Sequence, residues 1–198
     1  MGEYRREKIW DGVTRSWHWS LVVLVSLGGY FGEFMTFSTV EWHFYCGYAV
    51  LGWLAFRFFW GLVGPQPVRL RGLFPSPKAA LAYLKGVGKR EPSGTPGHNP
   101  LAALSVLAIL LLLLTQASIG LFISSDDFFA SGPLAYLISD DLSSALSGWH
   151  KTFAKGLLAL VSLHVSMILF YLIWKKENLA RAMVTGWKWV KVDPDEPS

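Results

Sequence analysis

Cysteine is nearly absent from this sequence, with Cys46 the single one among 198 residues. One cysteine excludes a disulfide within the chain, a CxxC redox motif and a cysteine-based zinc site. Cys46 lies among aromatic residues in an apolar stretch, which favours a small packed side chain. The hydrolase motifs GxSxG and HExxH are absent as well, and no Ser–His–Asp set stands out. The sequence also has no internal repeat, low-complexity tract or heptad pattern.

Charged residues are also scarce. They make up 16% of the chain, whereas hydrophobic residues make up 52%, and a soluble domain usually carries about 25% charged residues. The net charge of +4 comes from basic residues that flank the apolar stretches instead of forming one basic module. The expected partner is therefore the lipid bilayer and not nucleic acid. Residues 1–15 lack the short apolar core of a cleaved signal peptide.

Four apolar stretches have the length of a helix that crosses a membrane. A bilayer core of about 30 Å needs about 20 helical residues. The stretches cover residues 16–37, 42–63, 101–123 and 149–174. No alternating strand pattern is present, and backbone polar groups in lipid must be satisfied within the chain. The sequence therefore predicts an all-α integral membrane protein, a single domain over residues 1–198 that forms a four-transmembrane-helix bundle.

Two connections predict short interfacial helices. The connection 64–100 is basic, and within it Ser76 and Pro77 are typical of a helix N-cap and first helical position. The residues after Pro77 predict a short amphipathic helix on the membrane surface. The connection 124–148 is acidic and half apolar, and residues 134–146 have helical spacing. That spacing predicts a second helix across the outer surface.

The distribution of Lys and Arg predicts the orientation. Four basic residues precede residue 16, six lie in the connection 64–100 and five follow residue 174, whereas the other two connections have none. Cytoplasmic segments carry the excess of Lys and Arg. We therefore expect both termini in the cytoplasm and the chain in a bacterial inner membrane.

Four of the five histidines lie in the predicted spans, where ionisable residues are rare and usually functional. His18 lies near the inner face, and His43 and His150 lie near the outer face. His164 follows His150 by 14 residues, which is about 21 Å deeper on the same side of the helix. Depth therefore pairs His18 with His164 and His43 with His150. His98, in a connection, is interpreted as an ordinary loop histidine.

Each pair supplies two imidazoles, which suits haem iron because the porphyrin provides the other four nitrogens. A zinc site takes three or four protein ligands, and no carboxylate lies at a matching depth. A helical bundle also offers flat apolar slots between facing helices. The sequence therefore predicts two haem b groups (iron protoporphyrin IX), with His18, His43, His150 and His164 as the metal ligands.

Glycines and one arginine are further candidate residues for haem binding. Gly47 and Gly52 follow His43 on the second span, where a porphyrin could press on the backbone, and Gly28, Gly29 and Gly32 are similar positions on the first. Close helix–helix packing explains such glycines equally well. Arg57 lies 14 residues after His43, and a propionate of the inner haem would satisfy its charge. The alternative is that Arg57 extends to the cytoplasmic interface.

These residues resemble the bacterial di-haem cytochrome b(561) family, close to the b-type cytochrome subunits of membrane nickel–iron hydrogenases. The similar segments are HW at His18, WHFYCGYAVLGWLAFRFFWGLVGP around His43 and Arg57, GHNP at residues 97–100, GWHK and LHV around His150 and His164, and ENLARAMVTGWK at 177–188. The resemblance implies a four-helix bundle, two low-spin b haems, exchange of quinone or quinol, and a periplasmic redox partner such as a cytochrome c. Lys155 departs from the neutral residue expected there.

Three classes of function stay open at this point. The leading hypothesis is a quinone-linked oxidoreductase or electron-carrier subunit, in which the protein sets ligation, depth and polarity of the haems. The alternatives are a histidine-based proton or metal transporter and a membrane anchor for a redox enzyme such as a hydrogenase. A transporter would use intramembrane acidic residues, and none lies mid-span. The sequence also leaves open whether two copies form a homodimer.

Overall fold

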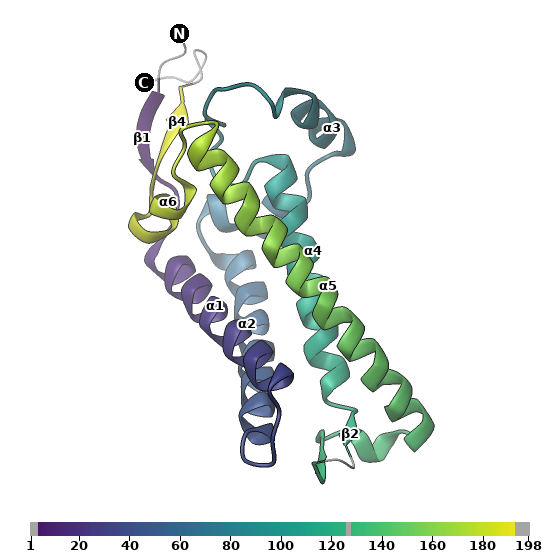
Figure 1. Ribbon diagram of the computed structural model, residues 1–198. Coiled ribbons are helices and arrows are strands. Elements are labelled where there is room, and N and C mark those ends of the chain that lie inside the picture. Colours follow the sequence, from purple (N-terminus) through teal and green to yellow (C-terminus); the bar gives the residue numbers. More distant parts are fainter. Residues whose placement is uncertain (1–3, 126–127, 193–198) are drawn as a thin grey trace. The chain divides into compact units, whose positions relative to one another are not determined.

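The computed structural model describes residues 4–125 and 128–192. Its contacts divide the chain into two compact units. Unit 1 comprises Met1–Ser16, Phe59–Leu107 and Ser162–Ser198, and unit 2 comprises Trp17–Phe58 and Ala108–Val161. Each unit is described by itself, and Figure 1 gives the order of the elements along the chain.

Four long helices dominate the described chain, as predicted. They are α1 (Gly12–Glu33), α2 (Val40–Val63), α4 (Pro100–Gly120) and α5 (Asp140–Ile173). Two shorter helices, α3 (Pro77–Gly86) and α6 (Leu179–Thr185), and single 3-10 turns at Gln66–Val68, Leu70–Leu73 and Ala135–Leu137 lie in the connections. The helix α1 begins at Gly12 because Asp11 caps it, with the Thr14 amide donating to Asp11 Oδ1 at 2.9 Å.

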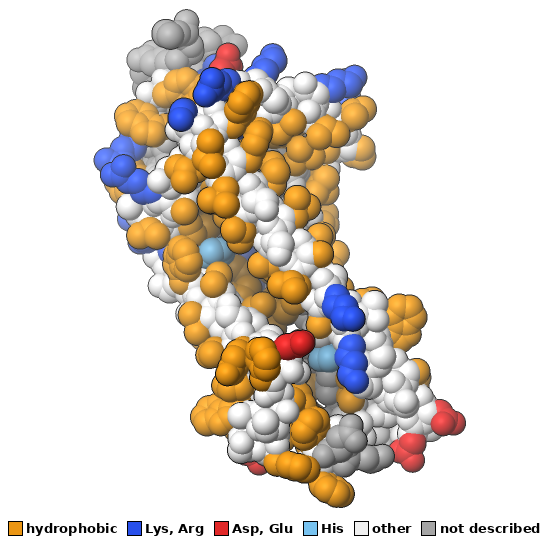
Figure 2. All heavy atoms as spheres, in the orientation of Figure 1, with side chains coloured by type: hydrophobic (Ala, Val, Ile, Leu, Met, Phe, Trp, Pro, Cys, Tyr) orange, Lys and Arg blue, Asp and Glu red, His pale blue; other side chains and the backbone are white. Residues whose placement is uncertain are grey.

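Among the described residues, α2, α4 and α5 are long and apolar enough to cross a membrane. The helix α1 has 22 residues but contains Arg15, His18 and Glu33 together with serines and glycines, and it is less apolar than the other three. Large hydrophobic side chains are exposed along the helices, as Figure 2 shows in orange. Such a surface is typical of contact with lipid. The chain is an integral membrane protein.

The predicted helix after Ser76 is confirmed. Ser76 Oγ accepts a hydrogen bond from the Ala79 amide at 3.2 Å, and Pro77 occupies the first helical position of α3. The exposed side of α3 carries Leu81 and Leu84 beside Lys78 and Lys85. This combination suits the interface between lipid and water, which is where the sequence places the helix.

The predicted separate helix over residues 134–146 is wrong. Only Ala135–Leu137 forms a 3-10 turn, and α5 begins at Asp140 and continues without a break to Ile173. The physical reason is that Ser139 caps α5: the Leu142 amide donates to Ser139 Oγ at 3.4 Å, and the Ser143 amide donates to the Ser139 carbonyl at 2.9 Å. Asp140 and Asp141 occupy the first turn of α5, where carboxylates stabilise the positive end of the helix dipole.

The sequence predicted no strands, but the structure contains two small antiparallel pairs. β1 (Tyr4–Lys8) pairs with β4 (Trp187–Lys191), and β2 (Ser124–Ser125) pairs with β3 (Ala130–Ser131). Gly186 ends α6 with φ of +86°, and a Cβ there would lie 2.6 Å from the Trp10 carbonyl oxygen. That carbonyl neighbours the Ile9 amide, which donates to the Gly186 carbonyl, so only glycine fits between β4 and the start of α1.

Each unit has its own apolar core. In unit 2 the buried side chains are Trp17, Leu21, Val50, Leu54, Leu113 and Leu157. In unit 1 they are Ile9, Trp10, Val68, Ala182 and Val190. Cys46 is buried in unit 2, where its Cβ would lie 3.3 Å from a Cβ added at Gly28. This close approach of α1 and α2 supports the interpretation of Cys46 as a packing residue.

Candidate functional site

Two of the four histidines lie together in unit 2. His43 is near the start of α2, and His150 is in α5. Their ring centroids are 6.0 Å apart, with an angle of 80° between the ring planes. Sequence depth predicted this pair, and the structure brings its members together.

Both imidazoles are held through the same ring nitrogen. His43 Nδ1 lies 2.9 Å from the Gly28 carbonyl oxygen, and His150 Nδ1 lies 3.1 Å from the Gln116 carbonyl oxygen. A carbonyl oxygen only accepts, so Nδ1 carries the hydrogen on each ring. The lone pair of a neutral imidazole is then on Nε2. This is the arrangement that orients a histidine toward a metal and fixes its tautomer.

The separation of the rings fits two ligands on opposite sides of one metal ion. Metal–imidazole bonds of about 2 Å put the centroids of two opposed rings about 6 Å apart. Within residues 4–125 and 128–192, no group of three or more His, Cys, Asp or Glu side chains is placed to hold a metal ion. The pair thus offers two axial nitrogens, the donor set that a haem iron requires from the protein.

Two glycines adjoin these rings. A Cβ on Gly32 of α1 would lie 2.9 Å from His43 Cε1, and a Cβ on Gly120 of α4 would lie 3.4 Å from His150 Cε1. The first distance is too short for any side chain, so Gly32 is the residue type that His43 requires beside it. The sequence offered Gly28, Gly29 and Gly32 as equivalent candidates for haem contact. The contact with the His43 ring distinguishes Gly32 from the other two.

Replacing Gly32 by alanine should therefore weaken cofactor binding at the His43–His150 pair. The added methyl group would push the His43 ring off the Gly28 carbonyl, and overpacking of this kind costs about 1–3 kcal/mol. The measurement is the haem content and the reduced-minus-oxidised absorption spectrum of the purified protein. Gly29→Ala is the matched control, because a Cβ on Gly29 meets nothing within 4 Å. Equal haem content in both variants would contradict the prediction.

The other two glycines of the predicted site have no close neighbour. A Cβ on Gly47 or Gly52 would meet nothing within 4 Å among the described residues. Helix packing therefore does not require glycine at either position, and a role of these two glycines in haem contact stays a prediction.

Arg57 lies in unit 2 with Trp17, the neighbour of His18 on α1. Its side chain is 7% exposed, and its guanidinium carbon lies 5.7 Å from the centroid of the Trp17 ring. Trp17 is itself fixed by a hydrogen bond from Nε1 to the Trp53 carbonyl at 2.8 Å. Arg57 is thus buried beside the segment that carries His18, and its contact with a haem propionate stays a prediction.

The second predicted pair is divided between the units. His18 belongs to unit 2, where its ring contacts the Trp19 ring edge-on at 5.2 Å, and His164 belongs to unit 1. Their pairing stays a prediction that depends on depth along the helices. His98, also in unit 1, packs against Trp10 with ring centroids 4.9 Å apart, consistent with its interpretation as a loop residue.

Gln116 is a residue of the site that sequence reasoning missed. Its carbonyl accepts from His150, and its buried side-chain Oε1 has no hydrogen-bond partner among the described residues. The signal was present, because Thr115 and Gln116 interrupt the most apolar stretch of the chain. A polar pair in such a stretch indicates a functional face of the helix.

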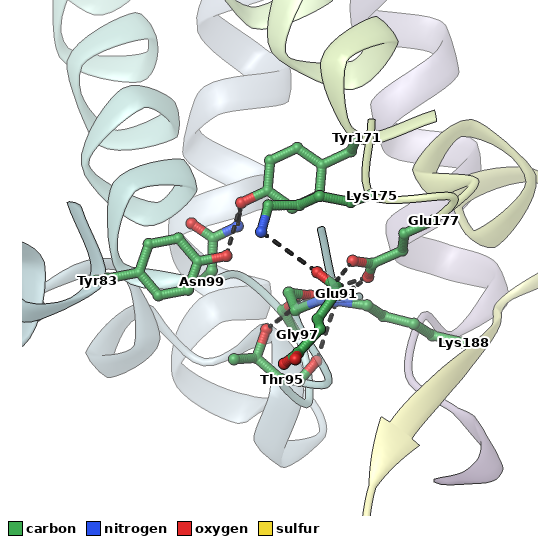
Figure 3. Close-up of polar contacts among 10 residues, drawn as sticks. Tyr83, Glu91, Thr95, Gly97, Asn99, Tyr171, Lys175, Glu177 and Lys188 are labelled. Carbon is green, nitrogen blue, oxygen red and sulfur yellow. Dashed lines mark hydrogen bonds and ion pairs between the residues drawn. The ribbon is translucent and has the colours of Figure 1, made fainter. Parts of the chain in front are cut away.

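A second polar cluster, also unanticipated, lies in unit 1 (Figure 3). Lys188 Nζ lies 3.2 Å from Glu177 Oε1, and both side chains are almost fully buried. Lys188 also donates to the carbonyls of Thr95 and Gly97, and Glu177 accepts from the amide and hydroxyl of Ser93. Burial lowers the pKa of Lys188, and the Glu177 carboxylate opposes that shift. The cluster joins the loop before α4 to β4.

Residues 9–186 match the family described as prokaryotic cytochrome b561. No curated protein matches the chain.

Proposed function

The chain belongs to the prokaryotic cytochrome b561 family, and from that membership we propose that it carries electrons across the bilayer through two b haems. The family binds b-type haem, and the chain is an integral membrane protein of that family. Each haem would be held by one pair of histidines. When bound, the haem iron supplies one-electron redox chemistry, and the protein supplies ligation, position and polarity.

The observation that carries this proposal is the geometry of His43 and His150. Their rings are 6.0 Å apart, and each Nδ1 donates to a backbone carbonyl. The Nε2 atom of each ring then keeps its lone pair and could ligate the haem iron without a change of tautomer. The second haem depends on the depth pairing of His18 with His164, and the buried Arg57 would satisfy a propionate there.

Four membrane crossings are part of the proposal, with both termini in the cytoplasm. The hydrogen-bonded pair β1–β4 requires its two strands to lie on the same side of the membrane. An odd number of crossings between them would separate these strands. Since α2, α4 and α5 are long and apolar enough to cross, this parity supports α1 as a fourth crossing, in spite of its less apolar composition.

The haems would exchange electrons between the membrane quinone pool and a periplasmic redox partner. Two haems near opposite faces shorten each transfer step, and the apolar helices exclude water from the path between them. The protein would accordingly act as a quinone-linked oxidoreductase or as the electron-carrier subunit of one.

The first test is the number of haems for each chain. A pyridine haemochrome assay, set against the protein concentration of the purified and monodisperse sample, should give about two. A value of one haem for each chain would mean that one of the two proposed histidine pairs does not bind haem. A well-folded protein that binds none after expression with added haem precursor would remove the whole electron-transfer function.

The acidic connection 124–148 is proposed as the docking site of a basic partner such as a cytochrome c. Of its four aspartates, Asp140 and Asp141 are exposed in the first turn of α5, and Asp126 and Asp127 lie outside the described residues. A negative surface next to His150 would steer a positive partner toward the haem on that side.

Replacing these four aspartates by asparagine should lower the rate of electron transfer to the partner and weaken its dependence on salt. The reason is that the aspartates would attract a basic partner, and salt screens such attraction beyond a Debye length of about 8–10 Å near physiological ionic strength. Stopped-flow transfer rates at several salt concentrations measure the effect, and unchanged haem spectra serve as the control. If the transfer rate changes neither with salt nor with the substitutions, the partner docks on another surface.

A further inference from the structure

The strand pair β1–β4 in unit 1 (Figure 1) has one face packed inward and one face exposed. Lys188 and Val190 on β4 are buried, and Val190 belongs to the apolar core of unit 1. Side chains directly opposite in an antiparallel pair share a face, and so do alternate residues along a strand. The outward side, termed the β1–β4 face below, therefore carries Tyr4, Arg6 and Lys8 of β1 and Trp187, Trp189 and Lys191 of β4.

The β1–β4 face combines three positive charges with two exposed tryptophans. Trp187 is 42% exposed and Trp189 is 60% exposed. The three cations, Arg6, Lys8 and Lys191, are exposed as well. The guanidinium carbon of Arg6 lies 5.1 Å from the centroid of the Trp187 ring, so this charge and this ring lie together. Among the described residues, no carboxylate forms an ion pair with any of the three cations, and their charge is available to a ligand.

Hydrogen bonds hold this sheet beside the end of a helix that can cross the membrane. The helix α5 is long and apolar enough to cross, and Trp174 directly follows its last residue. One loop bonds to both structures: the Trp174 indole donates to the Gly88 carbonyl at 2.9 Å, and the Lys191 amide donates to the Gly94 carbonyl at 3.0 Å. Three residues separate β1 from α1, a reach of about 10 Å. The sheet is thus tied to the level at which α5 leaves the lipid.

The composition of the β1–β4 face matches the headgroup region of a bilayer. Tryptophan is enriched at the boundary between lipid and water, where its ring lies among the headgroups. Lys and Arg beside a crossing helix attract anionic lipids through the negative phosphate. An acidic soluble protein would also attract the cations, but at this level the headgroups are present at a far higher local concentration.

We propose that the β1–β4 face binds the headgroups of anionic phospholipids, such as phosphatidylglycerol, in the leaflet at which α5 ends. The inference goes beyond the proposed function and does not depend on the haems. The cations would bind the lipid phosphates, and the two tryptophan rings would lie between the headgroups. Bound lipid would hold the first and the last strand of the chain against the membrane surface.

The test uses the purified holoprotein in nanodiscs of phosphatidylcholine that contain a minority of phosphatidylglycerol. A photoreactive group on the phosphatidylglycerol headgroup labels the residues beside it, and mass spectrometry identifies the labelled peptides. We expect label on residues 4–8 and 187–191, with much less from a phosphatidylcholine probe that carries the same group. Equal labelling by the two probes would overturn the proposal. Absence of label on these strands from either probe would also overturn it and would assign the face to a soluble acidic partner.

A triple variant measures the contribution of the charges. Replacing Arg6, Lys8 and Lys191 together by glutamine removes the charges and keeps polar side chains. Each cation near an anionic membrane surface contributes about fivefold in affinity, so the labelling preference for phosphatidylglycerol at the two strands should fall by about tenfold or more. The haem content and the thermal unfolding of the variant should stay unchanged, because the three side chains are exposed. An unchanged labelling preference would overturn the proposal.

A second triple variant is the matched control for net charge. Replacing Lys78, Lys85 and Lys89 by glutamine removes three exposed cations of unit 1 that lie outside the β1–β4 face. Labelling of the two strands should keep its preference for phosphatidylglycerol in this variant. An equal fall in both triple variants would show that net charge alone attracts the lipid, and would overturn the assignment of this face.

The C-terminal residues of the chain are the competing occupant of the β1–β4 face. Residues 193–198 lie outside the described residues and include Asp193, Asp195 and Glu196. A chain that ends at Val192 lacks these charges, and the phosphatidylglycerol probe should label its strands at least as strongly as those of the full chain. If only the shortened chain prefers phosphatidylglycerol, the acidic C-terminal residues occupy the face in place of lipid, and the proposal is overturned.

Discussion

Replacing His43 by alanine should remove one of two haems and leave the other spectroscopically intact. The variant loses one of the two nitrogens that the His43–His150 pair supplies, and a single imidazole cannot hold a low-spin bis-histidine haem. His150→Ala should abolish the same redox component, because both ligands serve one iron. The double variant should lose no more haem than either single variant, which is the non-additivity expected of residues that act together.

The measurement is a redox titration of the purified variants, with haem counted by pyridine haemochrome. His18→Ala and His164→Ala provide the matched comparison, because the depth pairing assigns both to the other haem. If His18→Ala and His43→Ala abolish the same component, the pairing is wrong. His98→Ala, at a loop histidine packed on Trp10, should leave both haems in place.

Replacing Lys188 by methionine should destabilise the protein by roughly 3–5 kcal/mol, which is typical when one partner of a buried ion pair is removed. The side chains of Lys188 and Glu177 are only 6% and 8% exposed. Methionine fills the space, but Glu177 is then a buried carboxylate with only the Ser93 bonds left. The carbonyls of Thr95 and Gly97 also lose their donor.

Thermal unfolding and limited proteolysis of the loop before α4, both in detergent, measure this effect. Lys191→Met is the matched control, since Lys191 lies on the same strand and is exposed. Adding Glu177→Gln to Lys188→Met should recover part of the loss, because no uncompensated charge remains. If Lys188→Met unfolds no more readily than Lys191→Met, the ion pair contributes nothing to stability.

Features that depend on local sequence were predictable. The cap formed by Ser76 and Pro77 sets the start of α3, and the apolar stretches predicted α1, α2 and α4 to within about four residues at each end, whereas α5 begins nine residues before the predicted span. The His43–His150 pair also followed from the sequence, because a regular rise per residue converts positions in a helix into depth. The family was recognisable from the segments around these histidines, and the match over residues 9–186 confirms it.

Features that depend on distant partners were not predictable. The strands β1 and β4 are short, and each is a strand only because it pairs with the other. The two are far apart in the sequence, so no local pattern predicts the pairing. Glu177 and Lys188 looked like ordinary charges of a polar tail, since nothing local shows that the loop 93–97 covers them. The start of α5 at Asp140 was misread because acidic residues suit both a surface segment and the first turn of a helix.

The pairing of β1 with β4 also fixes an order of assembly. Tyr4 pairs with Lys191, so β1 leaves the ribosome well before its partner β4 has been synthesised. At about 5–20 residues per second, that interval is roughly 10–40 s. Throughout it, the edge of β1 has no strand to bond to, while the helices between the strands are made and inserted. The sheet thus forms only after the helices between its two strands have been made, and a nascent chain stalled before Trp187 would carry those helices without it.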